Sequence, residues 1–73
     1  MKLKKDEFVL KVGSKIRELR KEKGLSIEKL ANNAEIERKQ LSRIELGEIN
    51  TSIYQVYNIT HTLEVPINKV FDF

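Results

Sequence analysis

The sequence predicts one small, all-α domain of five helices. Apolar residues recur every three or four positions through most of the 73-residue chain, which is the spacing of one face of an α-helix. Residue types that begin and end helices separate these segments. No run alternates apolar and polar residues as a half-buried β-strand does. These three observations together favour a bundle of short helices.

The first helix is predicted to begin at Asp6, whose carboxylate can accept hydrogen bonds from the free backbone amides of a first turn. Its apolar residues fall at spacings of four, four and three, and they are Phe8, Val12, Ile16 and Leu19. Gly24 is predicted to end it, because glycine enters the left-handed conformation without a Cβ penalty. Gly13 costs about 1 kcal/mol relative to alanine inside a helix, so the N-terminal part of this prediction is weaker.

The second and fourth helices each have a serine at the predicted N-cap. Ser26 precedes the segment "SIEKLANNA", and Ser52 with Gln55 three residues later forms a capping-box pattern. The fourth helix is expected to bury one apolar side, made of Ile53, Val56, Ile59, Thr60 and Leu63.

The last predicted helix begins at Pro66, whose fixed φ suits a first helical turn. Its apolar residues are Ile67, Val70 and Phe71. With no linker or repeat in the chain, we expect residues 6–73 to form a single domain and residues 1–5 to be a flexible basic tail.

The composition excludes several classes of function. The chain has no cysteine and one histidine, so a thiolate or zinc site is not expected. No apolar run is long enough to cross a bilayer or to serve as a signal peptide, which favours a cytoplasmic protein without a membrane partner. No nucleophile with a base and no paired carboxylates can be assembled, so we expect no enzyme, cofactor or small-molecule substrate.

The charge is unevenly distributed. The chain carries +3 overall, but residues 1–23 contain nine basic and four acidic side chains, whereas residues 24–73 contain five and seven. A polyanionic partner must therefore be bound through local placement of cations and not through bulk charge.

The segment "IERKQLSRIELGE", residues 36–48, combines such a placement with an apolar side. At 100° per residue, one face of a helix over 37–46 gathers Arg38, Lys39, Ser42, Arg43 and Leu46. The opposite face gathers Gln40, Leu41, Ile44 and Glu45. A helix held by its apolar side that presents three cations could enter a DNA major groove, where arginine recognises guanine O6 and N7. Taken alone, this pattern fits a solvated charged face better.

The preceding helix favours the DNA-binding interpretation over the solvated charged face. Two short helices that cross steeply need a small residue where their backbones approach, which Ala31 supplies. They also need inward apolar residues, and the chain has Leu30, Ala34, Ile36, Leu41 and Ile44. This is a helix-turn-helix arrangement.

At this point the chain resembles the Cro and phage-repressor family, the xenobiotic-response-element (XRE) type of small bacterial transcriptional regulators. The resemblance runs from about Gly13 to Phe71. It includes "IRELR...KGLS", the "LA" of the second helix, "LSRIELG" and "L.VPI..VF". It implies a compact five-helix, lambda-repressor-like domain in which the second and third helices form the helix-turn-helix.

The resemblance also implies roles for particular residues. Arg20 would pair with Glu45 and join the first helix to the recognition helix. Groove-facing positions match Arg38, Lys39, Ser42 and Arg43. Phosphate contacts are implied for the start of the second helix and the loop before the fourth, where the candidates are Ser26, Asn50, Thr51 and Ser52.

Four positions depart from the family pattern. Ile27 replaces a glutamine that commonly contacts phosphate, and Glu35 replaces a glycine in the turn, at about 1 kcal/mol if φ is positive there. Glu37 replaces a serine or threonine, and its carboxylate either caps the recognition helix or accepts a hydrogen bond from a cytosine amino group. Leu46 stands where a polar residue is common, so it weakens the phosphate footprint or marks a protein contact.

Aromatic residues remain outside this pattern. In the family the last helix and tail commonly form a two-fold dimer, so Phe71 and Phe73 are possible dimer contacts, unless both rings fold back into the core. His61 is expected to be a surface or partly buried side chain and not a ligand, while Tyr54 and Tyr57 either pack partly or border the DNA.

These observations lead to a hypothesis about function. We expect a sequence-specific regulator that binds double-stranded DNA as a homodimer, on a palindromic operator, through the helix at Glu37–Leu46. The alternative is a protein-interaction module or antagonist on the same scaffold that does not bind DNA, which Glu37, Leu46 and the net −2 of residues 24–73 favour.

Overall fold

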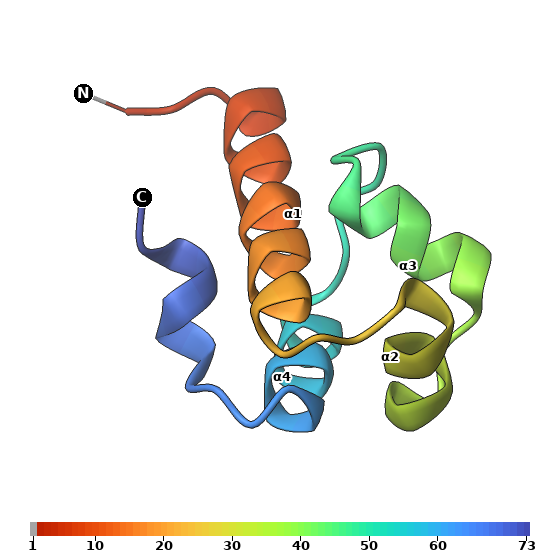
Figure 1. Ribbon diagram of the computed structural model, residues 1–73. Helices are drawn as coiled ribbons and strands as arrows, with labels where there is room; N and C mark the ends of the chain where they lie inside the picture. The colour runs from red at the N-terminus through yellow and green to blue at the C-terminus, as the bar shows by residue number, and fades with distance from the viewer. Residues whose placement is uncertain (1) are drawn as a thin grey trace.

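The computed structural model describes residues 2–73, which form four α-helices and one 3₁₀ helix (Figure 1). In chain order these are α1 (Lys5–Glu22), α2 (Ile27–Ala34), α3 (Arg38–Glu45), α4 (Ile53–Thr62) and the 3₁₀ helix η1 (Ile67–Phe71). The all-α prediction is confirmed over these residues, none of which lies in a strand. The prediction of a fifth α-helix was wrong. The segment after Pro66 is a five-residue 3₁₀ helix, a form that is common in such short segments.

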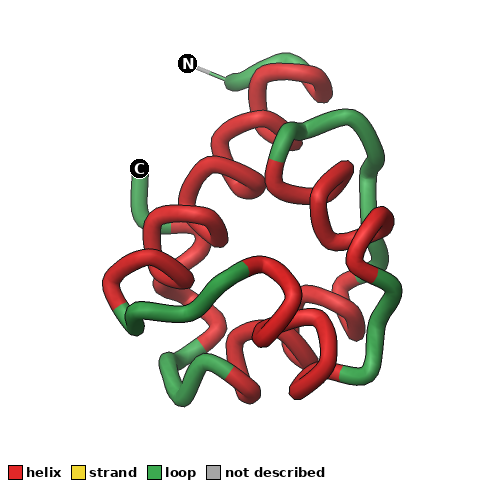
Figure 2. The backbone as a smooth tube through the Cα atoms, turned by 45° about the vertical axis from the view of Figure 1, so that its right-hand side comes forward, coloured by secondary structure: helices red, strands yellow, loops and turns green. Residues whose placement is uncertain are grey.

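α1 is the longest helix and lies between two groups of elements (Figures 1 and 2). On one side α1 contacts α3, which in turn contacts α2; on the other side it contacts η1. α4 packs against both α2 and η1 and closes the bundle. This arrangement holds α3 and η1 on opposite sides of α1.

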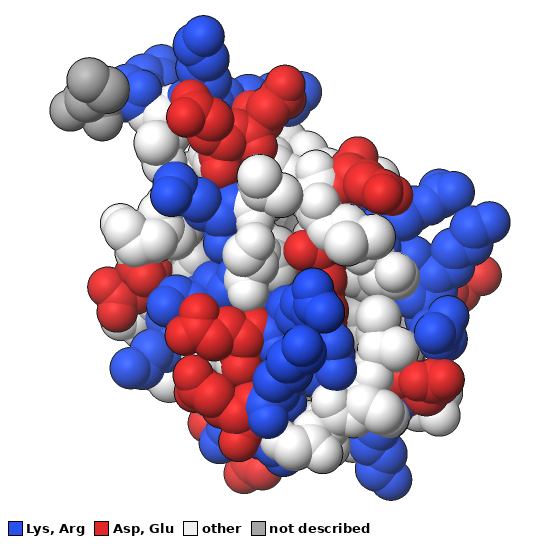
Figure 3. All heavy atoms as spheres, turned by 45° about the horizontal axis from the view of Figure 1, so that its top comes forward, with Lys and Arg blue, Asp and Glu red and all other residues white. Residues whose placement is uncertain are grey.

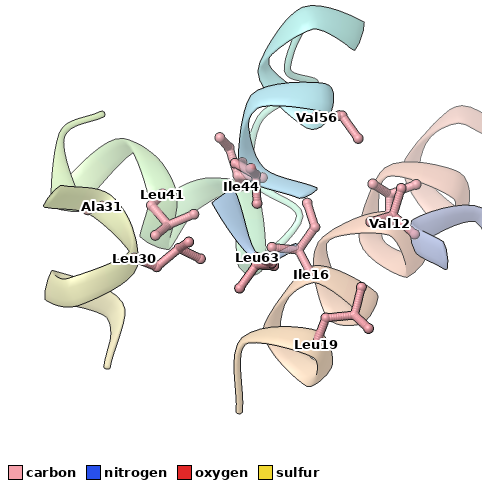
Figure 4. Close-up of a cluster of buried hydrophobic side chains, with 11 residues drawn as sticks. Val12, Ile16, Leu19, Leu30, Ala31, Leu41, Ile44, Val56 and Leu63 are labelled. Atoms are coloured by element: carbon pink, nitrogen blue, oxygen red, sulfur yellow. The ribbon is translucent and has the colours of Figure 1, made fainter. Parts of the chain in front are cut away.

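The core draws on every element. The closely packed side chains converge in the space that the helices surround (Figure 4). Its members are Val12, Ile16 and Leu19 of α1, Leu30 and Ala31 of α2, Leu41 and Ile44 of α3, Val56 and Ile59 of α4, and Leu63 and Val70. Burial of these side chains is the main source of stability in a domain that has neither a disulfide nor a metal cluster among its described residues.

Two helix starts are as predicted and one is not. The hydroxyls of Ser26 and Ser52 accept hydrogen bonds from the backbone amides three residues later, each at 3.0 Å. Gln55 does not complete a capping box, because its Oε1 accepts instead from Asn58 Nδ2. Asp6 is not the N-cap of α1. The cap is Lys4, whose backbone amide donates to Glu7 Oε1 at 3.3 Å.

The predicted tail of residues 1–5 therefore shares its last residue with a helix, since α1 begins at Lys5. The tail prediction also includes Met1, which lies outside the described residues.

α1 and α2 are each followed by a residue in the left-handed backbone conformation. α1 ends before Gly24, which has φ +71°, as the sequence predicted. The C-cap of α2 is Glu35, which has φ +58° and ψ +44°. A residue with a Cβ therefore occupies a conformation that favours glycine, at the turn of the helix-turn-helix.

The glycine at position 13 has a steric explanation that helix propensity does not give. A Cβ built there would collide with the backbone carbonyl oxygens of Ile44 and Glu45, at the C-terminal end of α3. The absence of a side chain thus lets α1 and α3 approach closely, and this contact fixes the position of α3.

Three residues assigned to apolar helix faces are not in the core. Phe8 and Phe71 are exposed by 42% and 37%, and Ile53 by 67%. Each lies near one end of its helix, where fewer neighbouring elements are available to cover it.

Candidate nucleic-acid interface

One side of α3 is anchored in the protein and the other is open. Leu41 and Ile44 are at most 2% exposed. Arg38, Lys39 and Arg43 are all exposed, and Ser42 between them is half-buried. The structure therefore places the three predicted cations on the exposed side of a helix whose opposite side is fixed.

Basic side chains are conspicuous in this region of the surface. Figure 3 shows Lys and Arg atoms gathered at the right-hand edge, on the side of the molecule where α2 and α3 lie, with acidic atoms among them. Within residues 2–73, neither Lys39 nor Arg43 forms an ion pair. Their charges are therefore available to an external anion.

Arg20 and Glu45 connect α1 to the buried side of α3. Arg20 Nε donates to Glu45 Oε2 at 2.8 Å, and Nη2 donates to Oε1 at 3.0 Å. The two side chains are 12% and 4% exposed. This is the pair that the family resemblance implied, and it leaves Glu45 unavailable to a ligand.

α2 is held by a small buried residue and by an amide of α4. Ala31 is 1% exposed and belongs to the buried core. Asn58 of α4 donates from Nδ2 to the backbone oxygen of Ala34 at 2.9 Å, which satisfies a carbonyl that the end of α2 leaves free. Asn58 was not among the predicted site residues, and its contact is visible only in the tertiary structure.

Glu37 is the N-cap of α3, but its side chain makes no capping hydrogen bond. The prediction that this carboxylate caps the recognition helix is therefore wrong. Glu37 is exposed beside the cations of α3, and a hollow is lined by Glu37, Lys39, Gln40, Arg43 and Ile49. The carboxylate is consequently free to accept a hydrogen bond from a partner.

The four predicted phosphate contacts lie in two places. Ser26 is the N-cap of α2 and Ser52 is the N-cap of α4. Each hydroxyl accepts a backbone hydrogen bond, which leaves its proton free to be donated, because a hydroxyl is both donor and acceptor. Asn50 and Thr51 precede Ser52 in the loop after α3, where Asn50 is exposed and Thr51 is half-buried.

An apolar surface adjoins the C-terminal end of α3. Leu46 is 52% exposed, and Leu10 of α1 is exposed to the same extent. Both line one hollow, together with Arg17 and Lys21 among other residues. Leu46 departs visibly from the family pattern in the sequence, whereas nothing in the sequence points to Leu10. The close packing of α1 against the turn at Gly47 brings Leu10 near Leu46.

Aromatic rings gather on the opposite side of α1. Phe8 stacks on Phe71 with the ring centroids 6.1 Å apart, and Phe73 meets Phe8 edge-on at 5.8 Å. Phe73 is 51% exposed. The two phenylalanines predicted as dimer contacts thus form a partly exposed aromatic cluster with Phe8. On α4, Tyr57 lies between Tyr54 and an exposed His61, against which it stacks at 5.6 Å.

No helix in the described part of the chain has both the length and the apolar character needed to cross a membrane. Residues 2–73 also contain no group of acidic or histidine side chains arranged to hold a metal ion.

Two short helices, α2 and α3, are anchored by buried apolar residues and joined by a short turn, and α3 presents exposed cations. This arrangement defines a helix-turn-helix domain. A family model described as "Helix-turn-helix domain" matches residues 13–72. The chain belongs to the helix-turn-helix family of DNA-binding transcriptional regulators, of the XRE type that its motifs resemble.

Individual relatives agree with this assignment. The HTH-type transcriptional regulator SlrR of Bacillus subtilis (strain 168) is 39% identical over 62 residues, which are 84% of this chain and 41% of SlrR. The chain therefore spans about two fifths of that relative.

Solved structures with the same fold include two that cover most of this chain. One is the restriction-modification controller protein C.AhdI from Aeromonas hydrophila, with 32% identity and a TM-score of 0.83 over 86% of this chain and 96% of that one. The other is an HTH_3 family transcriptional regulator from Vibrio cholerae, with 26% identity and a TM-score of 0.88 over 93% of this chain and 38% of that one.

Proposed function

We propose that this protein binds a specific, palindromic double-stranded DNA operator as a homodimer and regulates transcription from it. The observation that carries the proposal is the exposed cationic side of α3, whose opposite side is clamped by the core and by the Arg20–Glu45 pair. A rigid helix with projecting guanidinium groups can enter the major groove, which admits an α-helix.

The proposed contacts fall into two groups. Arg38, Lys39 and Arg43 reach base edges or nearby phosphates, with Ser42 as an auxiliary contact and Glu37 as an acceptor for a cytosine amino group. Ser26, Asn50, Thr51 and Ser52 bind phosphate oxygens at the starts of α2 and α4. In this arrangement the phosphate contacts position the protein and the base contacts select the sequence.

Homodimerisation is proposed through the surface that contains Phe8, Phe71 and Phe73. All three residues are more than one third exposed, and their rings form one cluster, in which Phe8 contacts both Phe71 and Phe73. Because α1 separates this surface from α3, a second copy bound there leaves both recognition helices uncovered. Two-fold symmetry of the protein then matches two-fold symmetry of the operator.

Selection from a random-sequence DNA pool tests the proposal. We expect enrichment of a two-fold symmetric site whose half-sites lie about one helical turn apart. Affinity for that site should fall steeply between two salt concentrations, since phosphate contacts release counterions. A pool without an enriched site, from protein with a normal cooperative unfolding transition, would contradict the proposal.

A protein-interaction module without DNA binding is the second candidate. The pair of half-exposed leucines, Leu10 and Leu46, beside the end of α3 favours it, because adjoining exposed apolar side chains can form the centre of a protein interface. The substitution Leu46→Lys discriminates between the candidates. A DNA-binding protein should gain affinity for DNA from the added cation, whereas an interaction module should lose its partner and still not bind DNA.

A further inference from the structure

An acidic residue of α2 meets the recognition helix at its first residue. Glu28 Oε2 lies 3.4 Å from Arg38 Nε, and the two side chains are 63% and 61% exposed. Glu28 is in the first turn of α2 and Arg38 opens α3. The contact thus bridges the two helices of the helix-turn-helix on the exposed side, and no sequence motif pointed to Glu28.

A carboxylate at this place is unfavourable for binding a polyanion. Glu28 follows Ser26, a proposed phosphate contact, by two residues. Unpaired, its charge would repel the DNA backbone whatever the base sequence. The guanidinium of Arg38 offsets that charge only while it stays next to Glu28. When DNA is present, the position of Arg38 and the repulsion by Glu28 are therefore coupled.

The atoms in contact leave Arg38 able to recognise a base. Arginine has one N–H at Nε and two at each Nη. The contact joins the carboxylate to Nε without a hydrogen bond, and neither Nη group of Arg38 donates a hydrogen bond within the described residues, so both can donate to guanine O6 and N7. In water an exposed ion pair holds a flexible side chain only weakly, but displacement of water by the DNA lowers the local dielectric and strengthens the pair.

We propose that Glu28 is a positioning residue for DNA recognition. It holds the guanidinium of Arg38 for a guanine, and its charge disfavours DNA that offers Arg38 no such base. This inference rests on the proposed function, and it deepens that function by assigning part of the sequence selectivity to a residue that need not touch a base.

The experiment compares wild-type protein with Glu28→Gln, which keeps the shape of the side chain and removes its charge. Binding is measured to a library in which each position of the selected operator is varied in turn, and to an unrelated duplex. We expect the guanine preference at one position per half-site to fall about two- to fivefold, the range that an exposed ion pair supports. Affinity for the unrelated duplex should rise.

A double-mutant cycle assigns the effect to Arg38. In the Arg38→Lys background, which keeps the positive charge and loses the fork, Glu28→Gln should leave all base preferences unchanged. Glu18→Gln is the matched control, because Glu18 is also an exposed glutamate, paired with Lys15 at 3.6 Å on α1. It should change neither preference nor affinity, and thermal unfolding verifies that each variant is folded.

The outcomes are distinguishable. If Glu28→Gln raises affinity for every duplex equally and leaves the base preferences intact, Glu28 is only a repulsive charge and the inference is overturned. The same holds if Glu28→Gln changes the preference in the Arg38→Lys background. If wild-type protein enriches no site, the proposed function itself fails, and this is read from the selection before any variant is compared.

Discussion

Arg20 holds Glu45 through two hydrogen bonds while its third nitrogen, Nη1, donates to the backbone oxygen of Leu25 at 2.9 Å. One guanidinium therefore joins the end of α1, the loop before α2 and the buried side of α3. No buried side-chain nitrogen or oxygen in the described residues lacks a hydrogen-bond partner. The recognition helix is thus fixed by a satisfied polar contact as well as by apolar packing.

Replacement of Glu45 by Gln should destabilise the protein. The change leaves Arg20, whose side chain is only 12% exposed, without a counter-charge. Loss of one partner from a buried pair lowers the free energy of unfolding by about 3 kcal/mol, which urea denaturation measures. Glu18→Gln removes an exposed pair and should cost less than about 1 kcal/mol. Equal effects of the two substitutions would show that the Arg20–Glu45 pair has no special structural role.

Gly13→Ala should also destabilise the protein, against the direction of helix propensity. Alanine favours a helix over glycine by about 1 kcal/mol, but here its Cβ would meet the carbonyl oxygens of Ile44 and Glu45. Forcing α1 and α3 apart should cost about 1 to 3 kcal/mol. Ser14→Ala, at the next and exposed position, should be neutral or slightly stabilising. A thermal shift of Gly13→Ala to higher temperature would contradict the close-approach argument.

The role of Gly13 could not be predicted from the sequence, because its close contacts are with residues of another helix. Local signals such as the N-caps at Ser26 and Ser52, and the stop at Gly24, depend on neighbouring residues and were found at those positions. The prediction that Phe8 and Ile53 lie in the core was wrong. A helical period gives the direction of a side chain, but it does not say whether another element covers that side chain.

The candidate site divides in the same way. The exposed cations of α3 follow from helical periodicity. The roles of Glu28, Leu10 and Asn58 depend on contacts between helices, which periodicity within one helix does not describe.

Glu35→Gly should stabilise the protein. Glu35 has φ +58°, and a residue with a Cβ is strained there by about 1 to 2 kcal/mol relative to glycine. Glycine's greater freedom in the unfolded chain offsets part of this gain, so an increase of about 1 kcal/mol in the free energy of unfolding is expected. Glu64→Gly tests the rule a second time, at φ +60°. Glu37→Gly, at φ −68°, should not stabilise. Destabilisation at both positive-φ positions would contradict the strain argument.

Phe73→Glu should weaken self-association of the protein. The ring is 51% exposed and contacts Phe8 edge-on, so a charge there disfavours an apolar interface with little loss of core packing. Sedimentation velocity should show a shift from dimer to monomer at a concentration where the wild type is dimeric. Tyr57→Glu is the matched control, because Tyr57 is 50% exposed on α4. If Tyr57→Glu dissociates the dimer and Phe73→Glu does not, the interface lies on α4 and not at the aromatic cluster.

Arg43→Ala should relax sequence selectivity and leave the fold intact. Arg43 lies in the last turn of α3, is exposed, and forms no ion pair within the described residues, so its removal costs little stability. Loss of a bidentate contact to guanine should reduce discrimination at one position of each half-site by about 1 to 3 kcal/mol. Binding to single-position operator variants measures this loss. Lys69→Ala, a cation of η1 on the far side of α1, should leave discrimination unchanged. If Arg43→Ala instead lowers affinity uniformly across sequences and reduces the salt dependence, Arg43 contacts phosphate and the base-reading role belongs to Arg38 or Lys39.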